Sequence, residues 1–261
     1  MSDDLLLRED RDGVTWLTMN NPAKLNALSD EMLAALQDSF DAIALDDTVK
    51  AVVLRGAGKA FCAGHDLRQM TQARQAEDGG AAAFGDLFER CATMMMTVQK
   101  LPQPVIASVH GIATAAGCQL VASCDLAVAE TGTRFGVNGV NIGLFCSTPM
   151  VALSRNIHTK QAFEMLVTGE FITATRARGL GLVNRVAEDL EAATSELAIL
   201  VASKLGSAVK IGKRAFYEQL EMGLSEAYRF TGEVMVENMR DRDTEEGIAA
   251  FLEKRPPDWQ T

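Results

Sequence analysis

Two segments of the chain combine small residues with side chains that are suited to chemistry. In the first, residues 56–70, a run rich in glycine and alanine leads to His65. In the second, residues 101–130, the small residues at 111–117 come just before Gln119. The ordinary pKa of histidine suits a proton carrier near neutral pH, and N–H groups at the start of a helix can bind a ligand oxygen. The second segment alone is equally compatible with an ordinary strand-to-helix corner that needs small residues for close packing.

The expected strands and helices place both segments in an α/β core. Residues 51–55 and 104–110 are short apolar runs without a helical period, as in buried strands. A helix is expected at 118–122 and a further strand at 125–130. The other expected elements are a hairpin of 5–9 with 14–19, a helix capped by Ser29, a mobile segment over the site at 71–84, helices at 84–99, 149–156 and 160–167, and a last strand at 183–186.

From residue 190 onward the pattern is almost entirely helical. Four helices are expected, at 190–204, 207–220, 225–239 and 244–255. Repeated strand–helix units followed by helices alone predict two parts, an α/β core at residues 1–189 and a helical module at residues 190–261.

Charge and composition argue against several classes of function. The net charge of −10 at pH 7 is unsuited to a nucleic-acid partner, and no apolar run approaches the roughly 18 residues of a membrane span. The glycines complete neither a dinucleotide fingerprint nor a phosphate-binding P-loop. The five cysteines form no C-x-x-C pair, which argues against zinc. Reduced thiols without a targeting segment predict a cytoplasmic protein.

Six motifs in order resemble the enoyl-CoA hydratase/isomerase (crotonase) superfamily, in particular its enoyl-CoA hydratase domain-containing branch. They lie at residues 22–28, 56–67, 110–125, 163–169, 174–183 and 246–255. The resemblance implies a spiral of ββα units with a C-terminal helical module that forms trimers or hexamers. It also implies an acyl-CoA thioester as substrate, with no metal and no cofactor other than the coenzyme A of that substrate.

The resemblance assigns the catalytic positions. The backbone N–H groups of His65 and Ala116 would form an oxyanion hole, which stabilises negative charge on a thioester oxygen. Hydratases of the family use two glutamates, and here Gln119 and Gly139 stand in those places. Because neither an amide nor glycine carries a proton near neutral pH, classical hydration is not expected. The imidazole of His65 is a separate candidate for a catalytic group.

The remaining candidates are expected to contact the substrate. They are Lys24, Leu25, Ala27, Ala63, Asp66, Leu67, Gly117, Asn141, Cys146, Ser147 and Lys254, with Lys254 or Arg255 near the phosphates. Asp66 is expected to brace its loop, and Cys146 is either a nucleophile or a small apolar residue. Three functions stay open: a lyase or isomerase with a relocated acid or base, a thioester hydrolase, and an acyl-CoA binder or oligomer subunit without catalysis.

Overall fold

A six-stranded sheet forms the centre of the computed structural model, which describes residues 4–259. Its strands, in spatial order, are β1 (Leu6–Arg11), β2 (Val14–Met19), β3 (Ala51–Gly56), β4 (Val105–Val109), β6 (Leu126–Glu130) and β9 (Arg185–Ala187). β1 pairs antiparallel with β2, and every other pair in this sheet is parallel. The inner strands are buried because helices cover both faces of the sheet.

A smaller sheet lies beside the main one and gives the chain its repeating unit. It contains β5 (Ile112–Thr114), β7 (Arg134–Gly136) and β8 (Ile172–Thr173). Strands β4 and β5 lead into α4 (Ala116–Ser123), and β6 and β7 lead through a 3-10 turn, η2 (Asn138–Ile142), into α5 (Pro149–Asn156). This succession of two strands and a helix confirms the expected ββα architecture.

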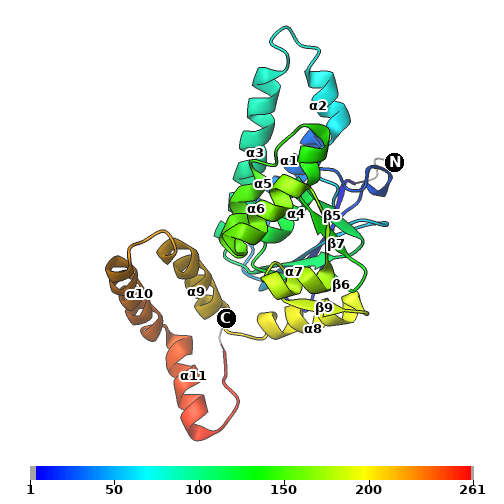
Figure 1. Cartoon of the computed structure of the whole chain (residues 1–261). Helices are drawn as coiled ribbons and strands as arrows, with labels where there is room; N and C mark the ends of the chain where they lie inside the picture. Colours follow the sequence, from blue (N-terminus) through cyan, green and yellow to red (C-terminus); the bar gives the residue numbers. More distant parts are fainter. Residues whose placement is uncertain (1–3, 260–261) are drawn as a thin grey trace.

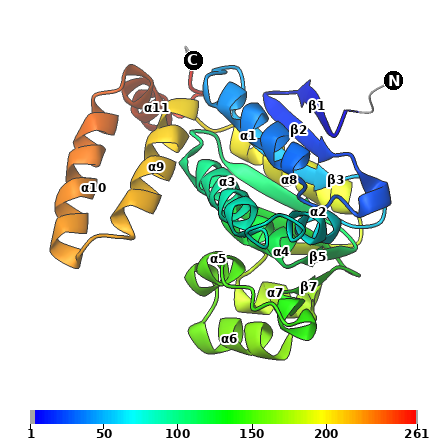
Figure 2. The same ribbon diagram turned by 90° about the horizontal axis from the view of Figure 1, so that it is seen from above.

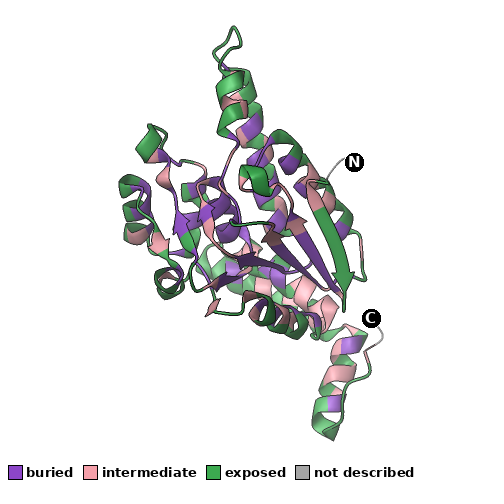
Figure 3. Ribbon diagram, turned by 90° about the vertical axis from the view of Figure 1, so that its right-hand side faces the viewer, coloured by how far each residue is buried: buried purple, intermediate pink, exposed green. Residues whose placement is uncertain are grey.

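Helices cover the two faces of the main sheet unequally (Figure 2). α1 (Asp30–Ala44) and α3 (Ala81–Lys100) cover one face, and α8 (Leu190–Ala202) packs on the other. Ser29 caps α1 as expected, because its side chain accepts the N–H of Met32. The buried strands stand out in Figure 3, where the edge strand β1 is exposed. The other elements of the core are η1 (Pro22–Lys24), α6 (Thr159–Thr168) and α7 (Ala174–Leu180).

Residues 71–84 are more helical than the sequence analysis expected. α2 (Leu67–Ala73) runs into this segment, and α3 begins at Ala81, so the two helices form a hairpin that projects from the core (Figure 1). Gly79 and Gly80 turn the chain with φ values of 66° and 90°. The carboxylate of Asp78 accepts the N–H groups of Gly80 and Ala82. A run of alanine, the best helix former, then starts α3.

The last three helices extend away from the core (Figure 1). They are α9 (Gly206–Gln219), α10 (Leu224–Met239) and α11 (Arg242–Glu253). α8, which the sequence analysis grouped with them, instead contacts β2, β3, β4, β6 and β9. Within residues 4–259 no single helix is long and apolar enough to cross a membrane, and α8 and α9 meet that test only as a pair bent by 101°.

Candidate functional site

The loop after β3 and the turn before α4 lie against each other. The N–H of Thr114 donates to the carbonyl of Cys62 at 3.0 Å. Gly64 has a φ of 91°, and a Cβ added to it would lie 3.0 Å from Ala115 Cβ and 3.3 Å from Ala116 N. A Cβ added to Gly117 would lie only 2.3 Å from the Cys62 carbonyl. These close approaches require glycine, and they bring His65 next to Ala116.

Two backbone donors in this region are available to a ligand. Ala116 is the first residue of α4, so its N–H has no acceptor within the helix. Among the backbone hydrogen bonds between elements of residues 4–259, neither His65 nor Ala116 acts as a donor. The positive end of the α4 dipole adds to the field at Ala116. The geometry therefore leaves both N–H groups free to bind a ligand oxygen, and their role as an oxyanion hole stays a prediction.

Ala115 holds a backbone conformation that the sequence did not predict. Its φ is 51° and its ψ is −121°, a combination that costs a residue with a Cβ of order 1–3 kcal/mol. The conformation is fixed on both sides, since Ala115 N–H donates to the Gly136 carbonyl and Ala115 C=O accepts the N–H of Gln119. This strained residue sets the direction of the next N–H, that of Ala116.

The side chain of His65 is partly buried and contacts α3. Both ring nitrogens are buried, and neither forms a hydrogen bond of good geometry among the described residues, although the Leu28 carbonyl lies close enough to act on the ring. The ring packs edge-on against Phe88 of α3, with centroids 5.8 Å apart. Burial lowers the pKa of the imidazole, and the Leu28 carbonyl and the Asp30 carboxylate oppose this effect only in part. The ring is thus neutral at neutral pH. Apart from the helical spacing of Phe88, no sequence pattern indicated this contact.

Gln119 and Gly139, which stand at the two glutamate positions, differ in their surroundings: Gln119 has a buried amide without a donor, and Gly139 has no space for a side chain. Gln119 lies on α4 with 5% of its surface exposed, and its Oε1 has no donor among the described residues. Gly139 is buried in η2, and an added Cβ would lie 2.2 Å from the Leu144 carbonyl and 2.8 Å from Cys146 Sγ. The chain around Gly139 has therefore closed over the space where a glutamate side chain would begin.

Lys24 and Asp66 tie the segment before α1 to the His65 loop. Lys24 Nζ lies 2.9 Å from Asp66 Oδ2, and Asp66 also caps α2 by accepting the N–H of Arg68 at 2.9 Å. Burial alone would raise the pKa of the Asp66 carboxyl, but these bonds hold it below its ordinary value. The Leu25 carbonyl accepts the N–H of Ala63 at 3.0 Å. Asp66 thus braces its loop, as expected, and its oxygens are engaged.

Some of the remaining predicted residues lie near the 63–67 loop. For the others, the structure shows different contacts. Ala27 is buried and Leu67 is half exposed at the start of α2. Asn141 Nδ2 donates to the Gly169 carbonyl at 3.3 Å, and Ser147 is exposed. Burial raises the pKa of the Cys146 thiol, so Cys146 is an uncharged, nearly buried residue and a poor nucleophile.

Lys254 does not join the site within one chain. It ends α11 in a left-handed conformation, and α11 and α2 lie at opposite ends of the molecule (Figure 1). The guanidinium of Arg255 is already paired with Glu246 through bonds of 2.6 and 2.9 Å. Neither cation lies near the 63–67 loop within a single copy. Their expected place near the phosphates stays a prediction.

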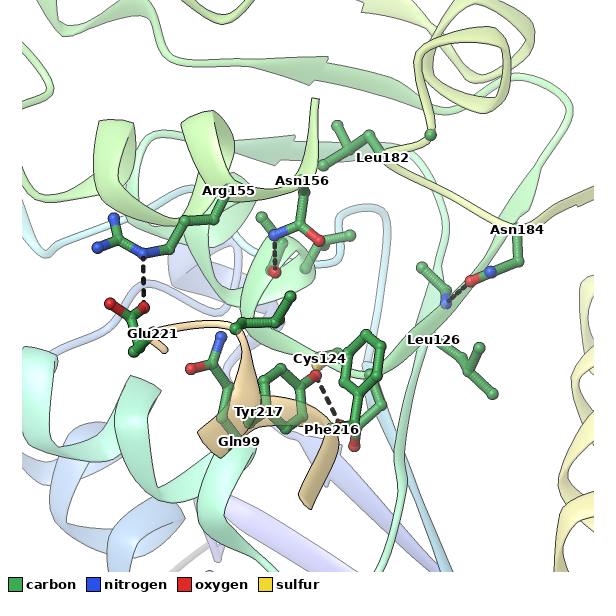
Figure 4. A pocket seen from close by; sticks show the side chains of 16 residues that line it. Gln99, Cys124, Leu126, Arg155, Asn156, Leu182, Asn184, Phe216, Tyr217 and Glu221 are labelled. Atoms are coloured by element: carbon green, nitrogen blue, oxygen red, sulfur yellow. Dashed lines mark hydrogen bonds and ion pairs between the residues drawn. The ribbon is translucent and has the colours of Figure 1, made fainter. Parts of the chain in front are cut away.

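A cavity of about 520 Å³ lies at the seam between the core and α9, away from the oxyanion donors. Figure 4 shows most of its polar side chains bonded to one another or to the backbone, whereas no bond is drawn for Gln99. Tyr217 donates to Asp125 at 2.8 Å, Asn184 accepts the N–H of Ala127 at 2.7 Å, and Arg155 faces Glu221 at 3.8 Å. Because most of its polar groups are already paired, the seam cavity is a weaker candidate for a reaction site. In residues 4–259 no group of three or more His, Cys, Asp or Glu side chains is placed to hold a metal.

Comparison with known proteins decides the family. The family model of enoyl-CoA hydratase/isomerase matches residues 9–261. The chain belongs to this family. Its crotonase-type fold is shared with a crystal structure titled enoyl-CoA hydratase from Mycobacterium smegmatis, at 53% identity and a TM-score of 0.95, covering 99% of this chain and all of that one. Human enoyl-CoA hydratase domain-containing protein 3 superposes with a TM-score of 0.93 at 42% identity over 98% of this chain and all of that one.

A curated relative corrects one expectation. Enoyl-CoA hydratase domain-containing protein 3 of Xenopus laevis is 43% identical over 98% of this chain and 86% of its own length, and it is named as a mitochondrial protein. The mouse and human proteins of that name are called mitochondrial as well. The expected cytoplasmic location is contradicted by these relatives.

Proposed function

We propose that the chain binds acyl-CoA thioesters and stabilises negative charge on the thioester oxygen. The observation that carries this is the pair of unengaged N–H groups of His65 and Ala116 on adjoining segments. Such preorganised donors contribute about 3–4 kcal/mol to a transition state that carries an oxyanion. Lys24, beside the same loop, supplies a half-exposed cation for the phosphates in an otherwise acidic chain. No cofactor beyond the coenzyme A of the substrate is required.

Classical hydration is slow in this proposal. Water addition needs one group to take a proton from water and another to deliver a proton, and each contributes about 10²- to 10⁴-fold. An amide at Gln119 and a closed backbone at Gly139 supply neither group. A thioester hydrolase is less well supported, because Cys146 is a buried thiol with a raised pKa and Ser147 is exposed.

The proposed assembly is a homotrimer or a pair of trimers. Leu224, Tyr228, Phe251 and Leu252, on α10 and α11, are each more than 70% exposed. Apolar side chains in this number favour contact with further copies of the chain. An assembly that placed α11 of one copy beside the loop of another would also supply Lys254 to the phosphates. Light scattering at micromolar concentration tests this, and a monomeric mass contradicts it.

Calorimetric titration with acetyl-CoA and crotonyl-CoA tests the binding proposal. We expect saturable binding that weakens as salt is raised, since phosphate contacts are screened. A heat trace without saturation at millimolar ligand contradicts it. Incubation with a panel of acyl-CoAs, read by mass spectrometry, then separates water addition, double-bond shift and release of free coenzyme A.

A further inference from the structure

The side chain of Asn26 is fully buried and joins the segment before α1 to the loop that follows β3. Its Nδ2 donates to the carbonyls of Ala57, Ala60 and Phe61 at 2.9, 2.8 and 3.2 Å. Its Oδ1 accepts the N–H of Asn21 at 2.9 Å. Three carbonyls around one atom require a donor there, which fixes the orientation of the amide. One side chain therefore holds together the first part of this loop.

The backbone and the space around Asn26 suit an amide at this place. Leu25 and Asn26 both have a φ of 53°, in the left-handed region that asparagine adopts more readily than most residues with a Cβ. A Cβ added to Gly56, at the end of β3, would lie 2.7 Å from Asn26 Nδ2. The turn thus directs the side chain at the loop, and the missing side chain at residue 56 gives the NH₂ group its space.

The far end of the loop is held by the same segment. The N–H of Ala63 donates to the Leu25 carbonyl at 3.0 Å, and the N–H of Leu28 donates to the Gly64 carbonyl at 2.8 Å. The Gly64 carbonyl and the His65 N–H belong to one trans peptide, in which the two groups point in opposite directions. The bond from Leu28 therefore directs the His65 N–H away from the segment before α1.

We infer that Asn26 is the residue that positions the His65 N–H toward the thioester oxygen, an inference that rests on the proposed acyl-CoA function. Because Asn26 is fully buried, it acts on the ligand only through the loop. An oxyanion donor is effective only within about 2.7–3.1 Å of the oxygen, so the loop must hold its position closely. Without the amide, three carbonyls lose their donor, and the loop has to move to let water reach them. The donor at residue 65 moves with it.

Infrared spectroscopy of bound butyryl-CoA, with a heavy carbon isotope in the thioester carbonyl, measures this effect at the ligand. Hydrogen bonds to a carbonyl oxygen lower its stretching frequency, so the frequency should be lower in the complex with the wild type than in free butyryl-CoA. Asn26→Asp keeps the shape of the side chain but replaces the NH₂ donor by oxygen, and Asn26→Gly keeps the left-handed turn without a side chain. Both variants should lose more than half of the frequency shift. Calorimetry should still show saturable binding, because Lys24 and the Ala116 N–H remain.

Gln103→Ala is the matched control for a loss of stability alone. Gln103 is a second buried amide, and its Nε2 donates to the carbonyls of Ile43 and Asp46 at 2.9 and 3.2 Å, at the far end of α1. Circular dichroism gives the Tm of each variant, and the spectra are recorded below the lowest Tm, so that every variant is folded. Gln103→Ala should keep the wild-type frequency shift.

The possible results separate the inference from the function on which it rests. Asn26 variants with the wild-type shift overturn the inference, as does a Gln103→Ala variant that loses as much of the shift as they do. Asn26 variants that no longer bind butyryl-CoA overturn it as well, because Asn26 would then act on binding as a whole. Wild-type protein that binds the thioester without any shift contradicts the oxyanion part of the proposed function, and the inference with it. Wild-type protein that does not bind contradicts the proposed function entirely.

Discussion

Lys213 Nζ lies 2.6 Å from Asp125 Oδ2, and this buried pair joins α9 to the start of β6. The ammonium also donates to the carbonyls of Val98 and Gln103 at 2.9 and 3.0 Å. The carboxylate accepts two further bonds, including one from Tyr217 at 2.8 Å. Burial raises the pKa of the Asp125 carboxyl, while the lysine favours its charged form. The helical module is therefore attached to the core through a polar cluster whose groups depend on one another.

Removal of one member of this pair should destabilise the fold strongly. Lys213→Met keeps the length of the side chain but leaves the Asp125 carboxylate buried without its cation, which costs about 3–5 kcal/mol. Urea unfolding measures the loss. Lys210→Met, one turn earlier on α9, is the matched control, because Lys210 pairs with an Asp47 that is 97% exposed. A pair of that kind contributes at most about 1 kcal/mol, so equal losses in the two variants would contradict this account.

Ala115→Gly should stabilise the protein. Glycine adopts the φ of 51° and ψ of −121° without the clash of a Cβ, which recovers part of the roughly 1–3 kcal/mol of strain. The flexibility of glycine in the unfolded chain offsets about 0.5–1 kcal/mol of this gain. Thermal unfolding should show a higher Tm. Ala34→Gly, at an exposed position of α1, should instead lower it, and a fall in Tm for both variants would show that Ala115 is not strained.

Gln119→Glu should raise hydration of crotonyl-CoA. A carboxylate at this position of α4 supplies one of the two missing proton carriers, and we expect a gain near 10²-fold, the lower end for a single group. Burial should raise the pKa of the new carboxyl, so the gain should be largest above neutral pH. Gln219→Glu on α9 is the control for the charge change. A rate no higher than that of the wild type would mean that residue 119 does not face the reacting carbons.

Folding stability should fall below pH 6.5 because of His65. In the unfolded chain the imidazole binds a proton near its ordinary pKa of about 6.5, whereas burial holds its pKa lower in the folded protein. The unfolded state therefore binds more protons as the pH drops from about 6.5 towards the folded pKa, and stability decreases over that window. Urea unfolding at pH 7.5 and 5.5 should show a larger decrease for wild type than for His65→Gln. Parallel decreases would exclude this assignment.

The sequence predicted the framework because its strands are short apolar runs. The runs at 51–55 and 104–110 correspond to β3 and β4, and the expected helix after Ser29 corresponds to α1. The small residues of the two segments also indicated a close approach of backbone, which the structure shows at Gly64 and Gly117.

Features that depend on distant contacts were not predictable. The pattern at 71–84 suggested an irregular segment, but the alanines after Gly80 extend a helix whose end is fixed by Asp78. Nothing in the residues around Gly139 showed that Leu144 closes the space above it, so a glutamate cannot be restored there by a single substitution. The position of Lys254 depends on the direction of α9, which is attached to the core through the polar cluster around Lys213 and Asp125.

Labelling of the five cysteines can report where the folded chain opens. Each is free and buried, and burial raises the pKa of Cys62, Cys91 and Cys118 to about 12. Alkylating reagents attack thiolates, so each thiol should remain unmodified until the structure around it unfolds locally. The cysteines lie in the loop after β3, in α3, near either end of α4 and before α5. The order in which the cysteines become alkylated would therefore give the order of local unfolding around the site, and no engineered label is needed.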